Sequence, residues 1–109
     1  MSITETPDKW VIIKVIGRDS KVYYKVFASW AGGYLDADSW KLNSGISKVD
    51  SDENFYFFYG FSGSCYKCRK TSYGVATSYT NSILEKLLGL PNELYLQEDS
   101  DNWLKLNEI

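Results

Sequence analysis

Histidine is absent from the 109 residues of this chain, and only two cysteines, two prolines and one methionine are present. Without an imidazole the chain lacks the usual proton shuttle and the usual activator of a serine or cysteine nucleophile. Two cysteines do not make a disulfide framework, which agrees with a reducing compartment and a cytoplasmic location. The shortage of such groups argues against an enzyme, although lysine, tyrosine or carboxylate chemistry stays open.

Long hydrophobic runs are missing as well. No segment approaches the ~20 apolar residues of a membrane helix, and the N-terminal residues 1–9 are polar, unlike a secretory signal. We therefore expect no membrane contact. Residues 1–8 are expected to be flexible.

The chain also lacks a strong charge of either sign, since its net charge is −2. Residues 55–90 hold four Lys/Arg against one Asp/Glu, and residues 91–109 hold one against five. A duplex-DNA binder normally shows a much stronger basic face, and a DNA mimic needs denser negative charge. Neither class is favoured, and duplex nucleic acid is not the expected partner.

Hydrophobic residues, by contrast, make up 44% of the chain and aromatic residues 17%, which is enough for one folded domain spanning 1–109. Alternating, β-branched and aromatic stretches predict strands at 9–16, 22–30, 40–42, 47–49, 55–61 and 65–70, with short terminal strands at 93–96 and 103–106. Residues 9–30 should form an antiparallel hairpin, and 50–54 a hairpin loop.

One helix is predicted over 77–88, with apolar residues at helical spacing, Thr77 or Ser78 as N-cap and Gly89 at the C′ position. The expected architecture is α+β: a mostly antiparallel sheet of five or six strands with one helix packed on one face.

Cys65-Tyr66-Lys67-Cys68 is the one recognisable chemical motif. Lys67, Arg69 and Lys70 would lower the thiol pKa and favour thiolate. A zinc site needs four ligands, so Cys65 and Cys68 are weak metal candidates that would need a dimer or carboxylates to complete the set. We favour two small, partly buried residues over a redox or metal module, and expect no cofactor.

Two aromatic-glycine stretches, 30–34 and 61–66, each contain an aromatic that leaves a strand, small residues and a second aromatic. Such loops can hold a planar ligand between rings, and nearby cations would suit an anionic, nucleotide-like molecule. The alternative is that the glycines mark bulges and the aromatics are core. The candidate ligand- or partner-binding residues are Trp30, Tyr34, Trp40, Tyr66, Lys67, Arg69 and Lys70.

Acidic residues gather in two places. Asp36 and Asp38 could hold a cation or act as an acid and base, but Asx turns beside the glycines explain them better. The acidic C-terminal segment 97–109 surrounds Trp103 and Leu104. It is expected to be a solvated terminus, with an acidic-aromatic surface for a basic partner as the alternative.

The stretch from Ser29 to Ile46, followed by the aromatic strand and Tyr66-Lys67-Cys68, resembles small uncharacterised accessory proteins of tailed bacteriophages and prophages. The resemblance covers residues 9–80 and carries no catalytic motif. It implies an accessory protein in the cytoplasm of an infected bacterium, where such proteins often neutralise a host enzyme or defence system.

The expected function is therefore that of a non-catalytic binding protein that inhibits or redirects a host protein, as a homodimer or in a stoichiometric complex. Exposed aromatics and arginine are typical of interface hot spots. The alternatives are a sponge or sensor for a nucleotide-like signal at Trp30, Tyr34, Tyr66 and Lys67, and a cysteine-dependent metal or redox module.

Overall fold

The computed structural model describes residues 4–17, 19–32, 38–89, 93–100 and 102–108. In chain order its elements are β1 (Thr4–Glu5), β2 (Lys9–Ile16), β3 (Val22–Trp30), β4 (Ser39–Leu42), β5 (Ile46–Ser51), β6 (Phe55–Gly60), β7 (Cys65–Arg69), α1 (Ser78–Leu88), β8 (Glu93–Leu96) and the 3-10 helix η2 (Trp103–Glu108). The α+β class with one α-helix is confirmed for the described residues. The count of five or six strands is too low, because eight are present among those residues.

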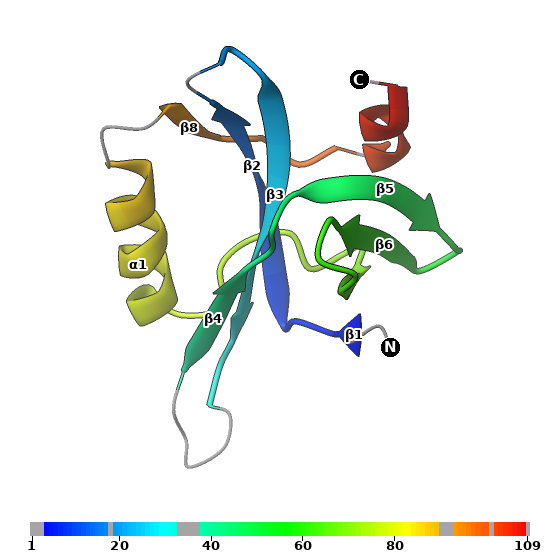
Figure 1. Ribbon diagram of the computed structural model, residues 1–109. Coiled ribbons are helices and arrows are strands. Elements are labelled where there is room, and N and C mark those ends of the chain that lie inside the picture. Colours follow the sequence, from blue (N-terminus) through cyan, green and yellow to red (C-terminus); the bar gives the residue numbers. More distant parts are fainter. Residues whose placement is uncertain (1–3, 18, 33–37, 90–92, 101, 109) are drawn as a thin grey trace.

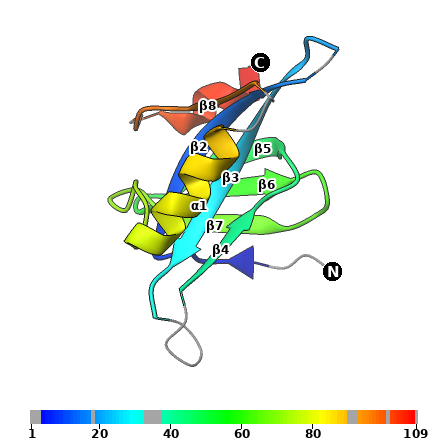
Figure 2. The same ribbon diagram turned by 90° about the vertical axis from the view of Figure 1, so that its left-hand side faces the viewer.

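The strands form two sheets of four rather than one. Sheet A has the order β1-β7-β6-β5, and sheet B has the order β4-β3-β2-β8. All pairings within the sheets are antiparallel except β1 with β7. Figure 1 shows three layers, with α1 on the left, sheet B in the centre and sheet A on the right. In Figure 2 the strands of sheet A cross behind those of sheet B.

The central layer explains the composition of β2. Trp10 and Ile12 belong to the core between the two sheets, whereas Val11 and Ile13 belong to the core beneath α1. Because successive side chains of a strand point to opposite faces, a strand covered on both sides must be apolar at nearly every position. The predicted hairpin 9–30 is confirmed, with residue pairs running from Lys9 and Ser29 to Ile16 and Val22.

The helix begins where the sequence predicts. The Thr77 hydroxyl accepts a hydrogen bond from the Thr80 N–H, and the Thr80 hydroxyl accepts one from the Thr77 N–H, which forms a capping box. Leu84 is buried against sheet B. Gly89 ends the helix as its C-cap with φ −85°, so the predicted C′ role for this glycine is wrong.

Two further expectations need correction. The hairpin loop of 50–54 is shorter, because β5 continues to Ser51 and pairs there with Tyr56. The predicted strand 103–106 is a 3-10 helix. In such a helix residues three apart lie on one side, so Trp103 and Leu106 both pack on the core between the sheets; a strand would have pointed them to opposite faces.

Candidate functional site

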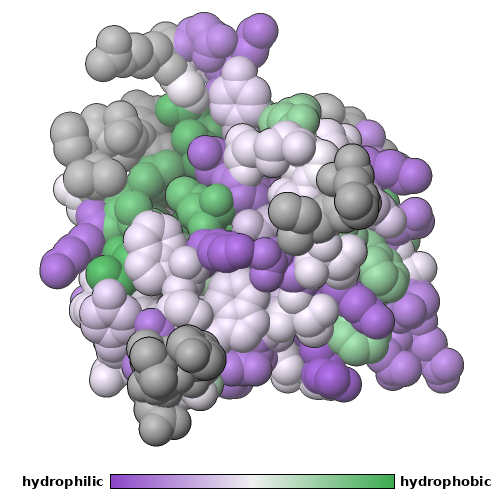
Figure 3. Space-filling view, turned by 60° about the horizontal axis from the view of Figure 1, so that its bottom comes forward, coloured by the Kyte–Doolittle hydropathy of each residue, from purple (hydrophilic) through white to green (hydrophobic). Residues whose placement is uncertain are grey.

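A small pocket lies between the edge strands of the two sheets. Its volume is about 240 Å³ and it is lined by Glu5 of β1, Trp30 of β3, and Ser39, Trp40 and Lys41 of β4. β1 is one edge strand of sheet A and β4 is one edge strand of sheet B. The pairing of Trp30 with Ser39 brings the two tryptophans to the same end of sheet B. Figure 3 views this lower end of the molecule and shows polar and intermediate side chains across its centre, with hydrophobic ones gathered towards the α1 side.

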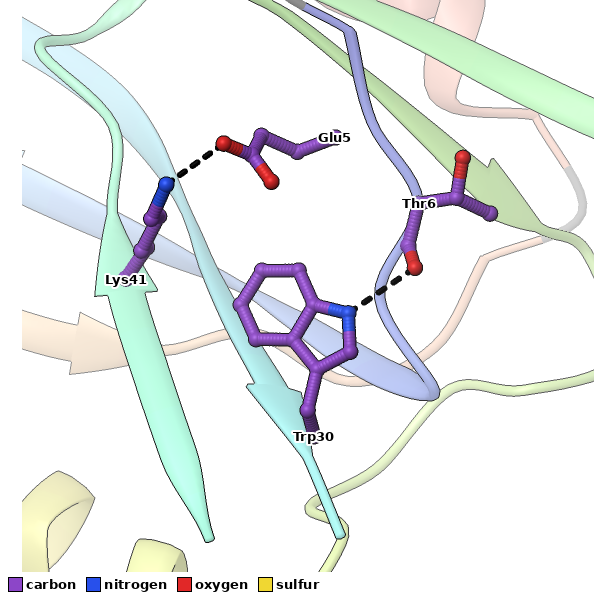
Figure 4. A network of polar contacts seen from close by, with 4 residues as sticks. All are labelled: Glu5, Thr6, Trp30 and Lys41. Carbon is purple, nitrogen blue, oxygen red and sulfur yellow. Dashed lines mark hydrogen bonds and ion pairs between the residues drawn. The ribbon is translucent and has the colours of Figure 1, made fainter. Parts of the chain in front are cut away.

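Each tryptophan is held by a different contact. The Trp30 indole N–H donates to the Thr6 carbonyl at 2.9 Å (Figure 4), which fixes its ring beside the segment between β1 and β2. The Trp40 ring stacks on Phe27 of β3, with ring centroids 5.6 Å apart and an interplanar angle of 18°. Trp40 is 36% exposed, so part of its ring, held in place by Phe27, is accessible to a partner.

An ion pair joins the two edges. The Lys41 ammonium donates to Oε1 of Glu5 (Figure 4), and this hydrogen bond is the main reason that the pKa of Lys41 is raised. Tyr66 is paired with Glu5 in the sheet register. Burial raises the pKa of the Tyr66 phenol, with Lys41 acting in the opposite direction. The pocket therefore holds a cation whose charge is already balanced.

The predicted ligand site of Trp30, Tyr34, Tyr66 and Lys67 is brought together only in part. Trp30 and Tyr66 belong to one cluster, but Tyr66 is only 4% exposed and is a core residue. Lys67 points to the other face of β7, as its partly exposed position between buried neighbours indicates. Tyr34 lies outside the described residues. The alternative prediction, in which the aromatics of 61–66 belong to the core, is confirmed for Tyr66.

The two cysteines lie on opposite faces of β7, as residues three apart in a strand must. Cys68 is fully buried in the core between the sheets, and both thiols are free. Burial raises the pKa of Cys65 and raises that of Cys68 well above its usual value. The hypothesis that neighbouring cations lower the thiol pKa is therefore wrong, and the two sulfurs cannot share one metal ion within a chain.

The basic triplet also divides. Lys67 and Arg69 both lie over the Phe55 ring, with Nζ 4.4 Å and Cζ 5.1 Å from its centroid. Lys70 instead lies over Tyr56, at 4.9 Å, and lines a second pocket of about 290 Å³ with Tyr56, Asp99 and Ser100. Two residues of the acidic segment thus line a pocket with a basic residue that directly follows β7.

The acidic candidates have structural roles where they are described. Asp38 accepts a hydrogen bond from the Gly32 N–H at 3.1 Å, and Asp36 lies outside the described residues. Trp103 is 1% exposed and stacks on Tyr73, so the acidic-aromatic surface does not include this tryptophan. No group of three or more potential metal ligands occurs within the described parts of the chain.

Sequence reasoning missed Glu5 and Lys41, whose pairing spans 36 residues and leaves no local signal. It also missed the division of β6, where Tyr56 and Phe58 are buried but Phe55, Phe57 and Tyr59 are only partly covered. That division was available from the sequence, because alternation places two of five consecutive aromatics on one face and three on the other.

Comparison with protein-family models, with curated proteins and with solved structures found no match to this chain. No helix among the described residues is both long and apolar enough to cross a membrane. The resemblance to phage accessory proteins stays a prediction.

Proposed function

We propose that this protein is a non-catalytic binding protein that forms a stoichiometric complex with a protein partner through the pocket between β1 and β4. The observation that carries the proposal is the pocket that joins edge strand β1 of sheet A to edge strand β4 of sheet B, lined by Trp30 and by Trp40, which is 36% exposed. Tryptophan anchors surrounded by a polar rim are typical of protein interface hot spots, and Glu5, Lys41 and Ser39 supply such a rim.

The size and charge of the pocket favour a protein over a nucleotide-like molecule. Ligand pockets usually have volumes of ~300–1,000 Å³, and this one has about 240 Å³. Lys41 is already paired with Glu5, so the pocket offers little net positive charge to an anion. The phage-like pattern of 29–46 includes Trp30 and Trp40, and it makes a bacterial host protein, such as a component of a defence system, the partner that we propose.

The test is to isolate a partner from bacterial lysate with the tagged protein and then reconstitute the complex from the two purified proteins. Ser39→Arg should block the complex, because Ser39 lines the pocket and is exposed. Asn81→Arg is the matched control: it adds the same side chain on the exposed face of α1, four residues before Glu85.

We expect a complex of fixed stoichiometry by sedimentation, weakened tenfold or more by Ser39→Arg and unchanged by Asn81→Arg, an order of magnitude expected for a disrupted interface centre. A complex that tolerates Ser39→Arg would exclude the pocket as the docking site. Failure of any purified partner to form a defined complex would overturn the proposed function.

A further inference from the structure

The outer face of sheet A carries a row of aromatic side chains. Tyr56 and Phe58 of β6 are buried against sheet B, so Phe55, Phe57 and Tyr59 point the other way. All three are partly exposed. Residues two apart on a strand are ~6.8 Å from each other, so the three rings form a short ladder. Figure 1 shows no element of the described chain beyond sheet A on that side.

Cations flank this ladder on both neighbouring strands. Across β7, Arg69 is paired with Phe55 and Lys67 with Phe57. Across β5, Lys48 is paired with Tyr59, and its Nζ lies 5.8 Å from the Tyr59 centroid. Three of the twelve Lys and Arg residues of the chain thus lie on this face.

The acidic groups near the face are few and engaged. Asp50, opposite Phe57, forms an exposed ion pair with Lys48 at 3.8 Å. Asp52 lies in the hairpin at the end of the face, where its Oδ1 accepts from the Asn54 and Phe55 N–H groups at 2.9 and 2.8 Å. These two bonds lower the pKa of Asp52. Glu53 follows Asp52 in the same hairpin.

We propose that the outer face of sheet A, made by Phe55, Phe57, Tyr59, Lys48, Lys67 and Arg69, binds single-stranded nucleic acid. Aromatic rings on a sheet, such as Phe57, stack with unpaired bases, and the flanking cations, two of which lie over the Phe55 ring, hold the phosphates. Every base has a π-face, so little sequence preference is expected. A duplex keeps its bases stacked inside, so they cannot stack on the rings. The weak overall charge of the chain also disfavours a duplex, whose binding depends on many phosphate contacts.

The test uses the full chain and fluorescently labelled oligothymidylate, oligouridylate and a mixed-sequence duplex, all of about twenty nucleotides, long enough for the site of one such domain. Binding is followed by fluorescence anisotropy. We expect both single strands to bind more tightly than the duplex, and their affinity to fall between about 50 and about 200 mM salt as counterion release requires. The two single strands also distinguish DNA from RNA.

Variants assign the binding to this face. Replacing Lys67 and Arg69 together by alanine should weaken single-strand binding tenfold or more, whereas Lys14→Ala with Lys86→Ala, the same charge change elsewhere, should not. Phe57→Leu keeps an apolar side chain but removes the ring, and should weaken binding about fivefold or more if a base stacks there. Circular dichroism and the melting temperature verify that each variant is folded.

Three outcomes would overturn the proposal: no measurable binding of either single strand, equal loss in the control pair, or a duplex bound as tightly as the single strands. Loss of the protein partner from the Lys67 and Arg69 variant, without any nucleic-acid binding, would instead assign the face to protein docking. Ser39→Arg should leave single-strand binding intact, so failure here is distinguishable from failure of the proposed partner site.

Discussion

Asn107 and Val49 are joined side chain to backbone across 58 residues. The Asn107 amide oxygen accepts from the Val49 N–H at 2.8 Å, and its NH₂ group donates to the Val49 carbonyl at 2.8 Å. Val49 lies in β5, the edge strand of sheet A opposite to β1. The asparagine therefore occupies the position of a further strand, and it satisfies backbone groups that an edge would otherwise present to other chains.

Asn107→Ala should lower the free energy of unfolding by about 1–3 kcal/mol, because it leaves the backbone groups of the buried Val49 without their partner. Self-association should also increase, since the edge of β5 becomes free to pair. Urea unfolding and light scattering measure the two effects. The control is Asn102→Ala. Asn102 is exposed and directly precedes η2, the helix that contains Asn107, and its substitution should change stability by less than about 0.5 kcal/mol.

Tyr73 gives the fold a dependence on alkaline pH. Its hydroxyl accepts from the Ile12 N–H at 3.0 Å and donates to the Gln97 carbonyl at 2.6 Å. Burial raises the pKa of Tyr73 to about 12, from 10.0 for a free phenol. The pKa of Tyr73 is higher in the folded than in the unfolded chain. The contribution of the neutral phenol to the free energy of unfolding is therefore fully present below pH ~10 and is lost as pH rises towards ~12.

Tyr73→Phe should therefore reduce stability at neutral pH by about 1–3 kcal/mol, since it leaves one buried donor and one acceptor unpaired. The variant should also lose less stability than the parent between pH ~10 and ~12. Denaturant unfolding at a series of pH values measures both. Tyr79→Phe, on the exposed face of α1, should change neither quantity; identical pH profiles for Tyr73→Phe and the parent would contradict the assignment.

The cysteines should react slowly with thiol reagents in the folded protein. Both are buried and both have a raised pKa, and the thiolate is the reactive form. At pH ~8 we expect Cys68 to react only upon unfolding, with Cys65 slow but faster than Cys68. The Cys65→Ser and Cys68→Ser variants identify which thiol is labelled, and the urea-unfolded chain gives the full count. Rapid labelling of Cys68 in the native state would contradict its position in the core.

Gly45 is required by both conformation and space. Its φ is +132°, and a Cβ there would lie 2.7 Å from Cδ2 of Phe61. Gly45→Ala should destabilise the protein by more than about 1 kcal/mol, because alanine strains at positive φ and must displace the Phe61 ring. Gly89→Ala is the control: its φ of −85° suits alanine. Equal melting temperatures for the two variants would show that the turn adapts freely.

The elements with a local pattern were predictable from the sequence, and their assembly was not. The hairpin 9–30 and the helix with its Thr77 cap follow from alternation, helical spacing and capping chemistry. The second sheet depends on the passage from β4 to β5, where Asn43 accepts from the Val26 N–H through its side chain at 2.9 Å. A buried asparagine linking distant strands has no sequence pattern that separates it from an ordinary Asn-Ser-Gly turn.

The candidate site also depends on contacts between distant segments, which leave no local sequence pattern. Trp30 and Trp40 were predicted as binding residues, and the pairing of β3 with β4 places both at one pocket. Their partners Glu5 and Thr6 come from a segment expected to be flexible, and a two-residue strand such as β1 leaves no periodic signal. Tyr66 was misassigned because the direction of a side chain on β7 depends on which face sheet B covers, and the sequence of β7 alone does not contain that information.

The order of sheet B bears on how the chain matures on the ribosome. β2 and its neighbour β3 follow each other in the chain, but its other neighbour is β8, which is synthesised some eighty residues later. Until residues 93–96 leave the exit tunnel, the second half of β2, from Ile13 to Ile16, lacks its strand partner on that side. Stalled or truncated translation products should therefore be the aggregation-prone and chaperone-bound forms of this protein, even though its finished fold protects that strand on both sides.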